Sequence, residues 1–120
     1  MTICLKRVYD EAAPGDGFRV LVDRLWPRGV SKQRAALDLW LKEVAPSREL
    51  RTWFNHADDR FSEFSTRYVA ELEDNPAISQ LQRIVRENSI TTLLYGAKNP
   101  KANHAIVLLK YMRSPDNLDH

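Results

Sequence analysis

The sequence has little of what would hold a small protein together by covalent crosslinks. It contains one cysteine, Cys4, among 120 residues, so no disulfide can form within the chain. A single thiol favours a reducing compartment. No basic segment followed by a signal-length apolar run stands at the N-terminus, and no apolar run approaches the roughly 18 residues that span a membrane. These absences predict a cytoplasmic protein with no membrane partner.

Glycine is also scarce, with four residues in the chain, and no glycine-rich phosphate loop is present. Gly15 and Gly17 precede a segment of strand character rather than a helix, which is the wrong order for a dinucleotide-binding loop. The formal net charge is only +2, too small by itself to indicate nucleic-acid binding. Apolar residues make up 43% and charged residues 28% of the chain, a balance typical of a folded domain with its own core.

Three apolar segments have the character of strands: residues 2–8, 18–25 and 91–97. The second has a continuous apolar centre at residues 20–22, which is typical of a strand covered on both faces in a parallel sheet. The turn-rich connection at residues 10–17 is short. It leaves open whether the first strand is parallel or antiparallel to the others.

Apolar residues at helical spacing fill the rest of the chain. The expected helices are residues 35–44, a short helix capped by Ser47 and ending at 54, one from 58 or 59 to the break at Asn75-Pro76, and residues 77–88 and 103–112. The pattern predicts one α/β domain over residues 1–113. It would be a small three-layer domain with a short, mostly parallel sheet of about three strands flanked by about five helices. Residues 114–120 are expected to form a flexible polar tail.

Charged residues gather just after the second strand, around Pro27 and Gly29: Asp23, Arg24, Arg28 and Lys32. The planar guanidinium group of arginine binds phosphate or carboxylate through two parallel hydrogen bonds, and a lysine adds a point charge. An aspartate at the end of the strand can orient an arginine or accept a proton. The alternative is structural, with the aspartate paired to one arginine and the remaining cations in solvent.

A second polar group follows the third strand and includes Lys98, Asn103 and His104. If the second and third strands are adjacent and parallel, both groups lie at the edge of the sheet where ligands bind in open α/β folds. A helix N-terminus suits an anion, and histidine exchanges protons near neutral pH. A purely structural histidine, bonded to a backbone carbonyl, is the alternative.

We therefore predict an anion site at these two loops. Asp23 and His104 are the predicted acid–base pair, and the predicted anion-binding residues are Arg24, Arg28, Lys32, Lys98 and Asn103. A third group, His56 with Asp58 and Asp59, invites a metal interpretation. Its spacing matches no known zinc site, and a helix cap with solvated acids explains it better. No metal site is predicted, and no cofactor is identified.

Several motifs resemble the YeaO-like family, a domain of unknown function. They are Val22-Asp-Arg-Leu-Trp-Pro-Arg-Gly29, Ala45-Pro-Ser-x-x-Leu-Arg-x-Trp-Phe-Asn-His56, Phe64-x-x-x-Tyr68 with Glu71-Leu72, and Leu93-Leu-Tyr-x-Ala-Lys98 with Asn103-His-Ala105. The resemblance covers roughly residues 7–112 and implies a small three-layer α/β fold, but it supplies no reaction. Relatives in the wider superfamily carry Cys-His-Arg where this chain has Asn103-His104-Ala105. Thiol chemistry proposed for such relatives is therefore not expected here.

Two functions remain open from the sequence. The favoured one is a domain that binds a small molecule bearing phosphate or carboxylate, with acid–base catalysis left open. The alternative is a nucleic-acid- or protein-binding module, in which the basic residues between Arg19 and Arg34 would follow a phosphate backbone. The sequence does not decide whether the protein is an enzyme.

Overall fold

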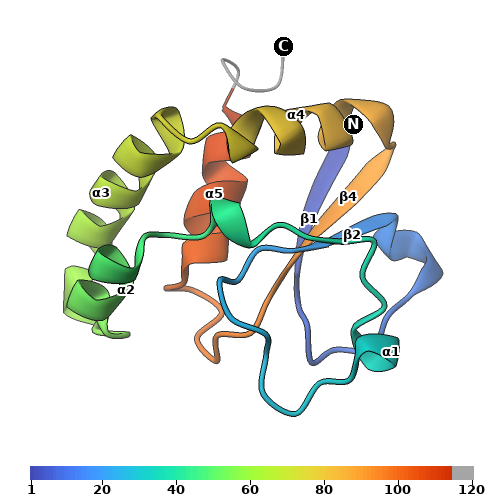
Figure 1. The fold of residues 1–120 in the computed structure, drawn as a ribbon, viewed down its shortest axis with the longest axis horizontal. Coiled ribbons are helices and arrows are strands. Elements are labelled where there is room, and N and C mark those ends of the chain that lie inside the picture. The colour runs from blue at the N-terminus through green and yellow to red at the C-terminus, as the bar shows by residue number, and fades with distance from the viewer. Residues whose placement is uncertain (115–120) are drawn as a thin grey trace.

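A computed structural model describes residues 1–114 (Figure 1). Apart from Ser114, the predicted tail lies outside this range. The strands are β1 (Thr2–Arg7), β2 (Phe18–Leu21), β3 (Leu39–Trp40) and β4 (Ile90–Tyr95). The helices are α1 (Lys32–Ala35), α2 (Arg48–Phe54), α3 (Phe61–Glu73), α4 (Ala77–Glu87) and α5 (His104–Arg113). Single 3-10 turns lie at η1 (Pro14–Asp16), η2 (Lys42–Val44) and η3 (Asp58–Arg60).

The four strands form one sheet in the order β1-β4-β2-β3, and every pairing is parallel. The predicted α/β class, with a short parallel sheet and five helices, is therefore confirmed, and the first strand is parallel to the others. The last of these four strands, β4, lies between β1 and β2, and Leu21 pairs with Leu94. The segments that follow β2 and β4 consequently leave the sheet side by side, which brings the two predicted loops together.

The two faces of the sheet bury different cores. Val20, Val22 and Leu93 belong to the larger core, which they share with α2, α3, α4 and α5. Leu21 and Leu94 point to the opposite face, where a smaller core also contains α1 and the connections around it. This alternation follows from the two-residue period of a strand. Figure 1 shows α3, α4 and α5 grouped apart from α1. Within residues 1–114, no helix has the length and apolar character needed to cross a bilayer.

The helix predicted at residues 35–44 is wrong. This stretch instead contains the end of α1, the short strand β3 and the turn η2. Its apolar residues have helical spacing but face two cores: Leu37 and Trp40 pack on the smaller one, and Leu41 and Val44 belong to the larger one. The spacing of apolar residues alone cannot distinguish a helix with one apolar face from a chain that passes around the edge of a sheet and packs on both sides of it. The crossing adds a fourth strand, β3, to the three that were predicted.

The second strand ends earlier than predicted. Its regular pairing stops at Leu21, although the Val22 N–H still donates to the carbonyl of Leu94 at 3.0 Å. One residue later, the Asp23 side chain replaces the backbone as the partner of β4, since its carboxylate accepts from the Gly96 N–H at 2.9 Å. The regular strand therefore ends where the hydrogen-bonding partner of β4 changes from the main chain of Val22 to the side chain of Asp23.

A partly buried ion pair stabilises the other end of the sheet. Arg19, on β2, is 5% exposed and donates to Asp16 and to the carbonyl of Ala35. Lys6, on β1, also contacts Asp16, with 3.1 Å between Nζ and Oδ2. Burial alone would raise the pKa of Asp16, but the Ala13 N–H, Lys6 and Arg19 outweigh it and lower that pKa below its usual value. The ionised carboxylate therefore stabilises the fold.

Replacing this carboxylate with an amide should destabilise the domain in a pH-dependent way. The variant Asp16→Asn leaves Arg19 buried without its anion, which costs about 3 kcal/mol at neutral pH. Because the folded pKa is depressed, the contribution is present above the unfolded value and disappears as pH falls through the folded one. The two proteins should converge in stability only below about pH 4. Urea unfolding across pH checks this, and an unfolding difference that stays constant down to acidic pH would contradict it.

Candidate anion-binding site

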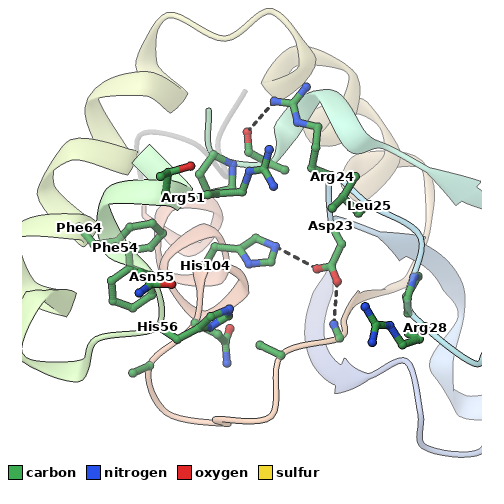
Figure 2. A pocket seen from close by; sticks show the side chains of 18 of the residues that line it. Asp23, Arg24, Leu25, Arg28, Arg51, Phe54, Asn55, His56, Phe64 and His104 are labelled. Atoms are coloured by element: carbon green, nitrogen blue, oxygen red, sulfur yellow. Dashed lines mark hydrogen bonds and ion pairs between the residues drawn. The ribbon is translucent and has the colours of Figure 1, made fainter. Parts of the chain in front are cut away.

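A cavity of about 480 Å³ lies beyond the carboxyl ends of β2 and β4 (Figure 2). Its walls come mainly from three stretches of chain, residues 23–28, 45–56 and 96–104. This volume falls in the range of small-molecule sites, about 300–1,000 Å³, and exceeds what one inorganic ion would fill. The position is the one expected for ligands of open parallel sheets.

Asp23 and His104 meet at the centre of this cavity (Figure 2). Asp23 Oδ2 accepts from the Gly96 N–H at 2.9 Å, which fixes the carboxylate against the end of β4. His104 Nε2 lies 3.1 Å from the Val22 carbonyl oxygen and 3.1 Å from Asp23 Oδ1. Both neighbours of Nε2 are acceptors, so the neutral ring carries its proton there. The predicted acid–base pair is in contact.

The start of α5 holds His104 in place. Asn103 is 2% exposed and caps the helix, accepting from the Ile106 N–H at 3.0 Å. Its amide nitrogen donates to the carbonyl of Asn99 at 2.7 Å. The next residue, His104, therefore enters the cavity wall from the first turn of α5, where the helix dipole favours negative charge. Asn103 also lines the cavity, but its side chain is engaged in holding the helix start.

Three arginines line the cavity: Arg24, Arg28 and Arg51. Within residues 1–114, no carboxylate lies within ion-pair distance of any of them. Arg24 makes one long hydrogen bond, 3.3 Å from Nη2 to the carbonyl of Ala45. The Nε atoms of Arg24 and Arg51 are buried and have no hydrogen-bond partner. The cavity wall therefore carries three cations that have no carboxylate within ion-pair distance in the described part of the chain.

Helix α2 supplies the wall that carries Arg51. Its N-terminus is tied to α3, because the Ser47 N–H and hydroxyl donate to the Glu71 carboxylate at 2.9 and 2.6 Å. Ser47 in turn caps α2 by accepting from the Leu50 N–H. Arg51 follows one turn later and points into the cavity from the side opposite Asp23 (Figure 2). The hydrogen bonds between Ser47 and Glu71 thus set the position of α2 and, with it, of Arg51, which faces the cavity.

The end of α2 has an unusual backbone. Asn55 and His56 both have positive φ, 46° and 56°, and the left-handed region is unfavourable for residues other than glycine, less so for asparagine. Two such residues in succession turn the chain sharply after the helix. Both line the cavity, and the His56 ring lies at its edge (Figure 2). Among residues 1–114, no three His, Cys, Asp or Glu side chains are grouped to hold a metal ion.

The remaining wall is aromatic. Phe54 and Phe64 stack with their ring centroids 4.3 Å apart and line the cavity beside His104. Behind them, Tyr68 donates to the carbonyl of Val44 at 2.7 Å. Burial raises the pKa of Tyr68 well above its usual range, and the Glu71 and Asp23 carboxylates add to this. Tyr68 is therefore a neutral hydrogen-bond donor within the core.

The structure separates the predicted residues into two sets. Asp23, Arg24, Arg28, Asn103 and His104 all line the one cavity. The two predicted lysines do not. Lys32 begins α1 and Lys98 lies in the β4–α5 connection, and both are exposed away from the cavity lining.

Sequence reasoning missed Arg51. Helical periodicity places it on a short helix far from the strand ends in sequence, and gives no sign that it faces a cavity. The only signal was the motif at residues 45–56, which contains Arg51, Asn55 and His56 together. All three line the cavity.

Comparisons with known proteins identify the family to which the chain belongs. Residues 2–117 match a family model described as "Inactive DUF488-N3 subclade". The chain is 46% identical over 114 residues to "Uncharacterized protein YeaO" of Escherichia coli (strain K12), covering 95% of this chain and 99% of that protein. It is 42% identical over 106 residues to "Uncharacterized protein Rv3073c" of Mycobacterium tuberculosis (strain ATCC 25618 / H37Rv), covering 88% and 89%. A comparison with solved structures finds no match. The chain therefore belongs to the DUF488 family as a YeaO-like member, in the subclade that the family model describes as inactive.

Proposed function

We propose that this domain binds a small molecule bearing phosphate or carboxylate in the cavity between β2, β4 and α2. The supporting observation is the set of unpaired arginines. A buried cation or N–H without an acceptor costs free energy, and Arg24 and Arg51 each have such a buried Nε. An anion in the cavity would supply a counter-charge and accept charge-assisted hydrogen bonds from these guanidinium groups.

Binding without covalent turnover fits the residues at the start of α5. Asn103 occupies the position where wider relatives carry cysteine, and its side chain is committed to capping the helix. Ala105, which replaces their arginine, is fully buried. No cysteine or serine is among the described residues that line the cavity. The description of the subclade as inactive is consistent with a binding role.

Proton transfer between Asp23, His104 and a ligand remains a prediction. The pair is in contact, with 3.1 Å between Nε2 and Oδ1, and it faces the cavity. Incubating the protein with each ligand that it binds, and following that ligand by NMR, tests this role. New ligand signals that disappear in His104→Gln would establish catalysis, whereas an unchanged ligand spectrum would limit the site to binding.

Nucleic-acid binding receives less support. Of the basic residues between Arg19 and Arg34, Arg19 is 5% exposed and held by Asp16. Arg34 donates to the carbonyl of Tyr9. The segment therefore presents fewer free cations than its composition indicates. Steeply salt-dependent binding to an oligonucleotide, with no binding of small phosphate esters, would favour this alternative.

Calorimetric titration with phosphate esters tests the proposal directly. Wild-type protein should bind at least one member of a panel of sugar phosphates, nucleotides and carboxylic acids. The variant Arg51→Gln should weaken that binding by about tenfold to a hundredfold, since a charged hydrogen bond contributes about 1.5–3 kcal/mol. The matched control is Arg83→Gln, an exposed position on α4 outside the cavity, and it should bind as the wild type does. Equal affinity of the two variants would reject the site.

A further inference from the structure

The chain turns sharply after α2 through two residues with left-handed backbone. Asn55 has φ 46° and ends the helix, since its N–H donates to the Arg51 carbonyl at 3.0 Å. Glycine and asparagine are the usual residues at such a helix end. His56, with φ 56°, repeats the left-handed conformation one residue further on. The end of α2 therefore accounts for the backbone of Asn55 and does not account for that of His56.

His56 differs from the other strained positions of the chain. Within residues 1–114, three residues other than glycine have positive φ, and two of them, Ala36 and Asn55, are each the C-cap of a helix. Glycine adopts this backbone without a steric penalty, whereas a Cβ atom makes it costly. Strained residues of this kind cluster at ligand-binding and active sites. The strain at His56 therefore indicates that its side chain serves a function that glycine could not.

The imidazole ring of His56 is accessible to a ligand. The residue is exposed, lines the cavity and lies at its edge (Figure 2). Its ring packs beside Phe54, with 6.3 Å between the ring centroids, and makes no hydrogen bond or ion pair within residues 1–114. Both ring nitrogens are consequently unoccupied in the described chain, and the protonated one can donate. The ring thus adds a donor to a cavity that three arginines line.

Resting on the proposed function, we propose that His56 is a ligand-binding residue whose ring N–H donates to an anionic oxygen of the phosphate or carboxylate in the cavity. The left-handed backbone fixes the direction in which the Cβ atom leaves the chain, and Phe54 supports the ring. The donor is thus held in place before the ligand arrives, so little side-chain entropy is lost on binding. In the absence of ligand, the strained turn only lowers the stability of the protein. Removing the side chain should therefore change binding and stability in opposite directions.

The variant His56→Gly tests both consequences. The probes are glucose 6-phosphate, adenosine monophosphate and citrate, which represent the sugar phosphates, the nucleotides and the carboxylic acids. In calorimetric titrations, affinity for the probe that the wild type binds most tightly should fall by about tenfold, the effect of one hydrogen bond to a charged group. In urea unfolding, the midpoint of the variant should lie above that of the wild type, because glycine adopts positive φ freely.

Two further variants separate the effect of the strain from that of the ring nitrogen. Ala36→Gly relieves the same kind of strain at the end of α1, outside the cavity lining, so its urea midpoint should rise while its affinity stays that of the wild type. His56→Phe keeps the strained backbone and a ring beside Phe54 but has no ring N–H. It should lose affinity as His56→Gly does, without the gain in stability.

The outcomes distinguish a failure of this inference from a failure of the proposed function. If Arg51→Gln weakens binding and His56→Gly does not, the anion site stands and the inference is overturned. Wild-type affinity in His56→Phe would also overturn it, since the ring would then suffice without its N–H. A lower urea midpoint in His56→Gly would make the ring a structural contact of Phe54 and would overturn the inference too. If the wild type binds none of the three probes, the proposed function fails, and the inference that rests on it fails with it.

Discussion

The double variant Arg24→Gln, Arg51→Gln should lose affinity for phosphate esters by about a hundredfold or more, yet it should be at least as stable as the wild type. Each guanidinium lines the cavity without a carboxylate partner within residues 1–114. Two charge-assisted hydrogen bonds contribute about 3–6 kcal/mol to binding, which corresponds to a loss of more than about a hundredfold. Binding and stability should therefore change in opposite directions.

The expected gain in stability follows from the surroundings of the two guanidinium groups. Two like charges that face one cavity repel each other, and each has a buried Nε with no acceptor, which is costly. Glutamine removes the repulsion, and it replaces part of a buried charged group with part of a neutral amide, which costs less to bury. In exchange, the double variant gives up the hydrogen bond from Arg24 to the Ala45 carbonyl, which at 3.3 Å is long and therefore weak. Residues kept for binding at the expense of stability are common in functional sites.

Urea unfolding and calorimetric titration on the same samples measure both effects. The contrasting control is Arg19→Gln, which removes an arginine that is buried and paired with Asp16. That variant should lose stability and, where it stays folded, keep its affinity. If the double variant unfolds more easily than the wild type by more than about 1 kcal/mol, Arg24 and Arg51 are structural.

The position of the cavity was predictable because it depends on the order of strands and loops. Parallel strands that lie side by side end at the same edge, so Asp23 after β2 and His104 after β4 had to approach each other once those strands paired. Continuous apolar runs such as residues 20–22 are strong signals of buried strands. The motifs then located the polar residues at the strand ends.

Arg51 and the failed helix show where such reasoning stops. The spacing of Leu37, Trp40, Leu41 and Val44 fits one helical face, but the chain crosses between two cores at that point. Arg51 faces the cavity because Ser47 and Glu71 dock α2 against α3, through side chains 24 residues apart. Tertiary contacts of this kind produce no regular spacing of residues in the sequence nearby, so they cannot be predicted from periodicity. The two predicted lysines lie outside the lining of the cavity, since proximity in sequence to a site residue does not bring a side chain into the cavity.

The geometry of the whole site depends on one glycine at the start of β2, and Gly17→Ala should be severely destabilising. Gly17 has φ 65° and ψ −135°, a conformation that is essentially confined to glycine. A Cβ added there would lie 2.2 Å from the carbonyl oxygen of Ile90, the first residue of β4. Backbone on both sides would have to move, because no rotamer can relieve a clash with a carbonyl.

We expect a loss of at least about 3–5 kcal/mol, from the strained conformation and the displaced strand together. That is a large part of the roughly 5–15 kcal/mol that keeps a small domain folded. Surviving folded protein should also bind phosphate esters more weakly. Moving β2 away from β4 would disturb the pairing of Phe18 with Thr91. It would also disturb the hydrogen bond between Asp23 and Gly96.

Gly15→Ala is the matched control, because it makes the same chemical change two residues earlier in the same turn. A Cβ at Gly15 meets no atom within 4 Å, and alanine loses less conformational entropy on folding than glycine does. This variant should be as stable as the wild type or slightly more stable. Urea unfolding of the two variants decides the question. Equal stability of Gly17→Ala and Gly15→Ala would show that the approach of Gly17 to Ile90 does not hold β2 against β4, and the cavity would then need another explanation for its fixed shape.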